Sequence, residues 1–142
     1  MDLKSLLLLM TGIGGALLSK LLGGLDHTVL TVFIFMAVDF AAGIVCAAAC
    51  KSSPKSKSGG LTSNACFKGI CRKGMIFLII IIAHRLDIEA GSNYIRDGVC
   101  IAFTASEGIS IIEMAGLMGV PIPAVVKKAV EVLRDKGYEQ EH

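Results

Sequence analysis

Long apolar runs separated by short polar segments dominate the chain. Residues 28–50 contain a single charge, Asp39, and residues 98–118 are interrupted only by Glu107 and Glu113. At about 1.5 Å per helical residue, each run is long enough to cross a hydrocarbon core of about 30 Å. We therefore expect transmembrane helices over 28–50 and 98–118.

Two weaker apolar segments lie beside the first of these helices. Residues 5–19 carry no charge, which predicts a spanning helix over 3–22, with a signal peptide or an interfacial helix as alternatives. The uncharged run 74–83 is too short to span alone. A helix over 70–88 spans only if the basic residues at its ends are accommodated at the membrane surface. Four spans are expected, and three stay open as the alternative.

Basic residues gather between the second and third predicted helices. Residues 51–73 contain no acidic residue, and Pro54 and Gly59–Gly60 predict a loop over 51–69. Positive charge in a short loop between spans marks the cytoplasmic side, so four spans place both termini there too. A nucleic-acid site is disfavoured because Phe67 is the only aromatic residue among these charges. The expected topology anchors are Lys51, Lys55, Lys57, Lys68, Arg72 and Lys73.

The chain after the last span predicts a turn and an amphipathic helix. Pro121 and Pro123, in the string GVPIP, stop the preceding helix. Residues 124–137 place apolar side chains on one face and charged side chains on the other, and Gly137 is expected to end this helix. We expect it to lie on the membrane surface or to pack on the bundle.

Composition agrees with a membrane protein. Hydrophobic residues make up 54% of the chain and charged residues 18%, against about 25% charge in ordinary soluble domains. The expected fold class is all-α: one integral membrane helical bundle with four, alternatively three, transmembrane helices and a C-terminal amphipathic helix.

Asp39 and Glu107 are carboxylates well inside predicted spans, where an ionised group is costly unless it faces a partner, a cavity or a pathway. Asp39 and Glu107 either pair with Arg85, Arg96 or a hydroxyl and fix helix packing, or they line water once several copies assemble. The residues assigned to such a pore or polar helix edge are Asp39, Glu107, Ser110 and Arg85.

Small residues recur beside these polar edges and at the N-terminus. In lipid, small side chains let two helices approach closely, so these positions predict helix packing. They are Gly12, Ala16, Ser19, Gly23, Gly43, Ala47, Gly108, Ala115 and Gly119.

No pattern in the sequence argues for an enzyme. The chain has no phosphate-binding loop, no G-x-S-x-G string and no plausible pair of nucleophile and base. Its five cysteines include no C-x2-C pair, which disfavours a metal site. We therefore expect no cofactor and no catalytic activity.

Asp39-x3-Gly43 precedes the basic string Gly69-x2-Arg72-Lys73, and Glu107-x2-Ser110-Ile111 leads to the GVPIP turn. In order and spacing, these motifs resemble the toxin secretion and phage lysis holin family, found in phages of Gram-positive bacteria and beside clostridial toxin genes. The resemblance covers residues 28 to 134. Met114 departs from the Asn expected in that family, which puts any hydrogen-bonding role at this point of the last span in doubt.

The resemblance implies a holin of the bacterial cytoplasmic membrane. Such a protein self-associates with membrane lipid around it and forms lesions that release an endolysin or a toxin, and an antiholin is a further possible partner. The alternatives are a small proton-coupled exporter of the four-helix type and a non-lytic membrane regulator of another holin.

Overall fold

Five helices make up the described part of the chain. The computed structural model describes residues 2–50 and 62–140, and no strand occurs in these two ranges. This confirms the predicted all-α architecture. The helices are α1 (Leu3–Leu21), α2 (His27–Cys50), α3 (Ser63–Ala90), α4 (Ile95–Leu117) and α5 (Ala124–Gln140).

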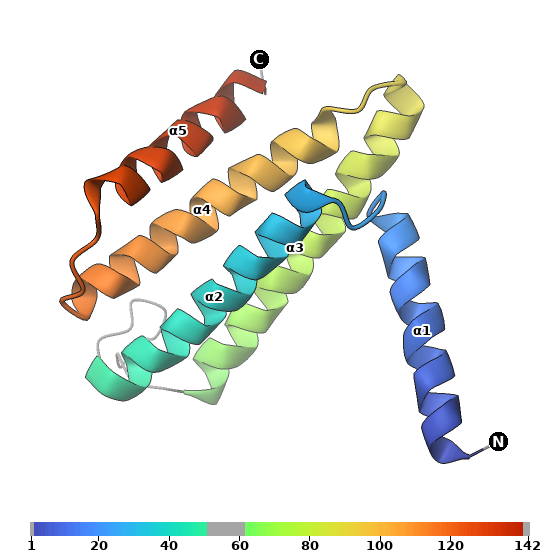
Figure 1. The fold of residues 1–142 in the computed structure, drawn as a ribbon, viewed down its shortest axis with the longest axis horizontal. Helices are drawn as coiled ribbons and strands as arrows, with labels where there is room; N and C mark the ends of the chain where they lie inside the picture. Colours follow the sequence, from blue (N-terminus) through green and yellow to red (C-terminus); the bar gives the residue numbers. More distant parts are fainter. Residues whose placement is uncertain (1, 51–61, 141–142) are drawn as a thin grey trace.

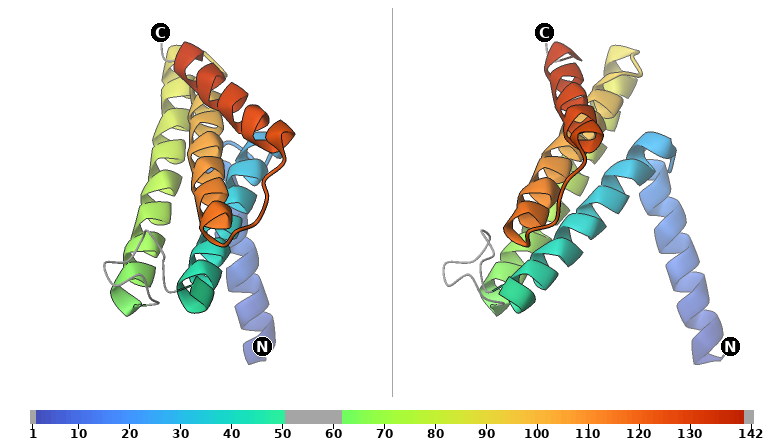
Figure 2. Two further views of the ribbon diagram at one scale, coloured as in Figure 1. Left: turned by 90° about the vertical axis from the view of Figure 1, so that its left-hand side faces the viewer. Right: turned by 60° about the vertical axis from the view of Figure 1, so that its left-hand side comes forward.

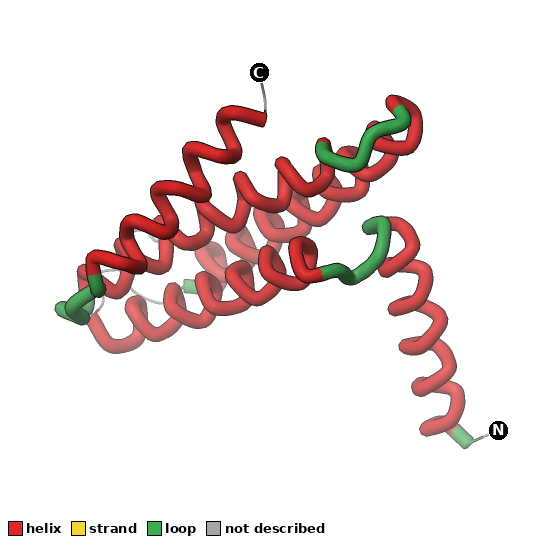
Figure 3. The backbone as a smooth tube through the Cα atoms, turned by 45° about the horizontal axis from the view of Figure 1, so that its top comes forward, coloured by secondary structure: helices red, strands yellow, loops and turns green. Residues whose placement is uncertain are grey.

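Helix α4 lies at the centre of the arrangement. It packs against α2, α3 and α5, and these four helices run roughly along one another, whereas α1 points away from them (Figures 1 and 2). Short loops connect α1 to α2, α3 to α4 and α4 to α5 (Figure 3). No residue of α1 is buried, so the fold within one chain leaves this apolar helix uncovered.

Three of the helices, α1, α2 and α4, are long and apolar enough to cross a membrane. The remaining predicted span, over 70–88, lies within α3. Helix α3 is long enough, but Arg72, Lys73, Arg85 and Asp87 flank its apolar centre, and this charge keeps α3 out of that set.

Helix α3 begins earlier than its hydropathy predicts. Its first residue is Ser63, and the Thr62 hydroxyl accepts a hydrogen bond from the backbone N–H of Ala65 at 3.3 Å. The predicted loop over 51–69 was therefore too long, because an N-terminal cap starts the helix within the polar segment. The predicted anchors Lys51, Lys55 and Lys57 lie outside the described residues.

Two glycines predicted on helix-packing stripes terminate helices instead. Gly23 follows α1 and has φ 78°, and Gly119 follows α4 and has φ 73°. In both turns the next amide donates back to the final helical turn, from Gly24 to the Ser19 carbonyl at 2.8 Å and from Val120 to the Ala115 carbonyl at 3.0 Å. These left-handed turns favour glycine, and they place both residues off the helix faces.

The apolar core joins α2, α3 and α4. Val32 and Met36 from α2, Ile80 from α3 and Cys100 from α4 are buried together. The rings of Phe33 and Phe77 stack between α2 and α3, with centroids 4.4 Å apart.

Helix α5 continues past its predicted end. Gly137 lies inside the helix, which runs to Gln140, and a side chain at this position would come within 3.4 Å of Ala102 in α4. Gly137 was predicted as a helix stop, but its lack of a side chain serves close packing instead. Gly108 does the same at the junction of α2, α4 and α5, because an added Cβ would lie 3.2 Å from Val130 and 3.3 Å from Phe35.

We expect Gly108→Leu to destabilise the protein by about 1–3 kcal/mol, since the new side chain overfills this junction. Gly116→Leu on the same helix is the matched control, because nothing lies within 4 Å of a Cβ there. Thermal unfolding in detergent, followed by circular dichroism, measures both. Equal midpoints for the two variants would contradict the described packing of α5.

Candidate functional site

Three charged side chains from three helices meet inside the bundle. Lys73 of α3 lies between Asp39 of α2 and Glu107 of α4. Its Nζ donates to Asp39 Oδ2 at 2.9 Å and to Glu107 Oε2 at 2.5 Å. We call these three residues the ion cluster.

The sequence places each member of the ion cluster on the buried face of its helix. Asp39 follows the buried Val32 and Met36 at helical spacing, and Glu107 follows Cys100 and Thr104. The side chains of Asp39 and Glu107 are 3% and 1% exposed, and that of Lys73 is 15% exposed. The carboxylates are thus withdrawn from the surface, and the ammonium group bridges them.

The ion cluster is unlike an exposed surface ion pair, which contributes little to stability. Ionised groups away from water are stable only when partners replace their hydration. The shared ammonium provides that replacement for two carboxylates at once. It also fixes the relative positions of α2, α3 and α4, because each helix supplies one member.

Sequence reasoning found the two carboxylates but assigned the wrong cationic partners. Asp39 and Glu107 were expected to pair with Arg85, Arg96 or a hydroxyl, whereas both bond with Lys73. Arg85 is exposed on α3, and Arg96 bonds elsewhere.

Lys73 was predicted as an anchor at a helix end, but α3 begins at Ser63 and places it well inside the helix. The signal that could have found it is its spacing to Ile76, Ile80 and Ala83, which form the buried face of α3. The other basic residues predicted beside it, Lys68 and Arg72, are exposed on α3.

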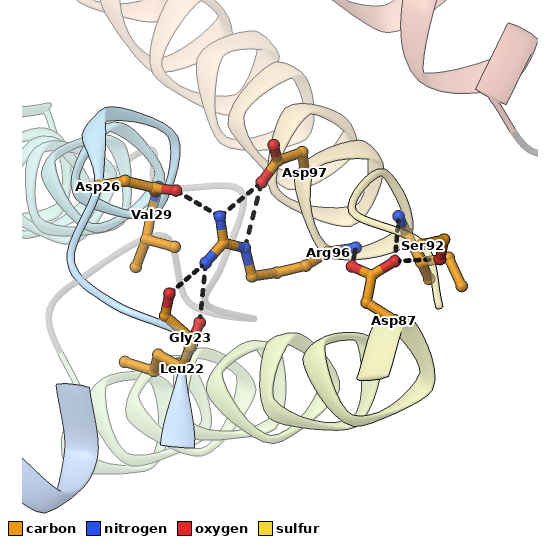
Figure 4. Close-up of polar contacts among 9 residues, drawn as sticks. Leu22, Gly23, Asp26, Val29, Asp87, Ser92, Arg96 and Asp97 are labelled. Atoms are coloured by element: carbon orange, nitrogen blue, oxygen red, sulfur yellow. Dashed lines mark hydrogen bonds and ion pairs between the residues drawn. The ribbon is translucent and has the colours of Figure 1, made fainter. Parts of the chain in front are cut away.

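A second polar cluster forms at one end of the bundle, around Arg96 (Figure 4). The Arg96 guanidinium donates to the Leu22 carbonyl at 3.3 Å, to the Gly23 carbonyl at 2.9 Å and to Asp97 at 2.9 Å. It also pairs with Asp26. Through these contacts Arg96 holds the turn between α1 and α2 against the start of α4.

Asp87, near the end of α3, secures the start of α4 (Figure 4). Its carboxylate accepts hydrogen bonds from the backbone N–H groups of Ile95 at 3.0 Å and Arg96 at 2.8 Å, and from the Ser92 hydroxyl at 2.6 Å. A carboxylate on the first amides of a helix satisfies donors that have no partner within the helix. The short turn between α3 and α4 is therefore fixed by the Asp87 side chain, which bonds with the turn and with the first amides of α4.

The other residues predicted to line a pore, to pack helices or to form the turn differ in their exposure. Gly12 and Ala16 are exposed on α1 and Ser19 is half-buried, while Ala47 and Gly108 are buried. Gly43, Ser110 and Ala115 are partly buried, and Pro121 and Pro123 lie between α4 and α5. Ser110 is thus not a member of the ion cluster.

Within residues 2–50 and 62–140, no group of three or more His, Cys, Asp or Glu side chains could hold a metal ion. The ion cluster places paired charges at the depth of apolar helices. Such an arrangement stabilises helix association and offers polar groups to water if the bundle rearranges.

Comparison with known proteins identifies the family. The model of the bacteriophage holin family matches residues 16–135. The chain belongs to the bacteriophage holin family. The matched residues include all three members of the ion cluster as well as Asp87 and Arg96. The proteins of this family are membrane proteins and not enzymes.

Several proteins are similar to the chain, and one of them is named a probable holin. An uncharacterised 14.9 kDa protein from the nagH 3′ region of Clostridium perfringens is 32% identical over 124 residues, which cover 86% of this chain and 88% of that protein. An uncharacterised protein of Listeria monocytogenes is 32% identical over 128 residues, covering 89% and 86%. A protein of Bacillus phage phi105 named a probable holin is 34% identical over 74 residues, covering 51% and 55%. No solved structure matches the chain.

We expect Lys73→Met to lower the free energy of unfolding by roughly 3–5 kcal/mol, because two buried carboxylates lose the ammonium that joins them. The combined variant Lys73→Met, Asp39→Asn and Glu107→Gln should recover a large part of this loss, since it removes the unbalanced charge. Denaturant unfolding in detergent measures both. Lys68→Met, an exposed lysine on the same helix, is the control, and a loss as large as that of Lys73→Met would contradict the ion cluster.

We expect Arg96→Lys to loosen the turn between α1 and α2, because lysine lacks the planar fork that reaches two carbonyls and two carboxylates. Hydrogen exchange of the amides of residues 22–26 should become faster by about tenfold, which corresponds to about 1.4 kcal/mol of local stability. The exposed Arg85→Lys provides the matched control. Unchanged exchange in Arg96→Lys would show that the guanidinium does not hold the turn.

Proposed function

We propose that this chain acts as a holin that self-associates in the bacterial cytoplasmic membrane and opens lesions, through which an endolysin or, in related systems, a toxin is released. Membership of the bacteriophage holin family supports the assignment. The ion cluster is the structural observation that carries it, because it gives a bundle of apolar helices a charged interior.

The position of the ion cluster suits a bundle that opens. Asp39 lies near the middle of α2 and Glu107 near the middle of α4, so both are far from either end of a span. In one chain the Lys73 ammonium bonds with both carboxylates. When copies associate, water can replace the ammonium contact, and the same groups then favour a hydrated interior over a lipid-filled one.

Helix α1 supplies a surface for self-association. It is apolar, has the length of a span and buries no residue against the rest of the chain. Nothing lies within 4 Å of a Cβ at Gly12, Gly14 or Gly15. Helices with such small positions pack closely in lipid, so α1 is suited to contact another copy.

Four spans follow if α3 also crosses the membrane. Its Lys73 is paired within the ion cluster, Asp87 is bonded at the other end, and Lys68 and Arg72 are exposed near the basic segment between α2 and α3. With four spans, we expect the N-terminus and the basic segment on the cytoplasmic side.

We expect induced expression to collapse the membrane potential of the host and to release a co-expressed endolysin. Lys73→Met should shift the time of lysis, whereas Lys68→Met should preserve it, because only the former disrupts the ion cluster. A potential-sensitive dye and culture turbidity follow the two events.

Cells that keep their potential and their turbidity would contradict lesion formation. A proton-coupled exporter would give a different result: Asp39→Asn would abolish transport of its substrate, and neither the parent chain nor the variant would depolarise the cell. Harmless expression of the unaltered chain alone would instead favour a regulatory role.

A further inference from the structure

Helix α5 does not lie across the end of the bundle. It turns back at Pro121–Pro123 and runs along α4 in the opposite direction (Figures 1 and 3). Val130 packs on Gly108 near the middle of α4, and Gly137 packs on Ala102 closer to the start of α4. These contacts join the second half of α5, from Val130 to Gly137, to residues 102–108 of α4, so this half of α5 lies beside α4 and not beyond its end.

The exposed surface of α5 carries charged side chains from Lys127 to Glu139, together with the exposed valines Val125, Val126 and Val132. Val130 and Gly137 are buried and Leu133 is half-buried, and these residues face α4. All the charged side chains of α5 are exposed, namely Lys127, Lys128, Glu131, Arg134, Asp135, Lys136 and Glu139. We call these seven residues the charged face of α5.

The position of α5 beside α4 limits what the charged side chains of α5 can contact. Helix α4 is long and apolar enough to span the membrane, so a helix packed along it places its charges within the hydrocarbon region. Charged side chains at that depth face protein or water, because contact with lipid is costly.

The bundle does not cover the charged face, since the described residues of α5 pack on α4 from one side only. We propose that the charged face of α5 lines the water-filled interior of the assembled lesion, with α4 behind it. This inference rests on the proposed function and names the helix that contacts water.

The composition of the charged face fits a lumen of low selectivity. Four of its residues are basic and three are acidic, and the signs alternate from Lys128 to Glu139. The side chains of Arg134 and Asp135 approach to 3.5 Å. Rings of one sign select ions of the opposite sign, whereas mixed charges do not. An opening that passes both small ions and a folded protein needs hydration without strong attraction for either sign.

A disulfide that holds α5 on α4 tests this placement. An added Cβ at Gly137 would lie 3.4 Å from the Cβ of Ala102, close to the separation of about 3.5–4.5 Å found in disulfides. The double variant Ala102→Cys and Gly137→Cys is made in a chain whose native cysteines are replaced by alanine, with Ala102→Cys alone as the control. Gel mobility with and without reductant reports the extent of cross-linking.

The cross-linked chain, reconstituted in phosphatidylglycerol and phosphatidylcholine vesicles, should still release trapped dye, with no gain on reduction. If cross-linking abolishes release and reduction restores it, α5 must leave α4 and the inference is wrong. If the unmodified chain releases no dye at all, the proposed function fails instead.

Charge reversal tests whether the face contacts water. In planar bilayers, Glu131→Lys together with Asp135→Lys should shift the reversal potential in a salt gradient towards anion preference. Glu89→Lys, an exposed acidic residue at the end of α3, is the control. A shift no larger than that of the control would overturn the assignment, and this readout does not depend on the disulfide.

Discussion

The position of Lys73 between Asp39 and Glu107 is the contact on which the bundle depends. Each of three helices supplies one charged group, and the two acceptors are almost completely buried. Apolar side chains alone do not favour helix–helix contacts over helix–lipid contacts, because lipid tails are equally apolar. The ion cluster supplies that specificity, since α2, α3 and α4 must all meet for one ammonium to reach both carboxylates.

Several features of the fold follow from hydropathy. The runs around Asp39 and Glu107 predict α2 and α4 because long apolar segments with one or two charges have few other stable structures. The beginning of α3 was not predicted, because a Thr62 cap continues the helix into polar sequence. For the same reason, the pairing of Lys73 with the two carboxylates was not predicted. A lysine at a helix end reaches the surface, whereas a lysine inside a helix on its apolar face needs a partner.

The other wrong predictions concern glycines. Spacing along the sequence does not distinguish a glycine that ends a helix from one that allows two helices to pack closely. Gly23 and Gly119 adopt positive φ and terminate helices, whereas Gly108 and Gly137 lie inside helices and allow close contact. The distinction arises from tertiary contacts, such as that between Gly137 and Ala102. The same contacts bring α5 back along α4, and they place a charged surface beside an apolar span.

The most direct test of the ion cluster is a distance measurement by solid-state NMR in lipid bilayers, with labelled lysine nitrogen and labelled carboxyl carbons. We expect magnetisation transfer from Lys73 Nζ to the carboxyl carbons of both Asp39 and Glu107. Transfer to neither carboxyl, with Lys73 Nζ instead exchanging freely with water, would contradict it.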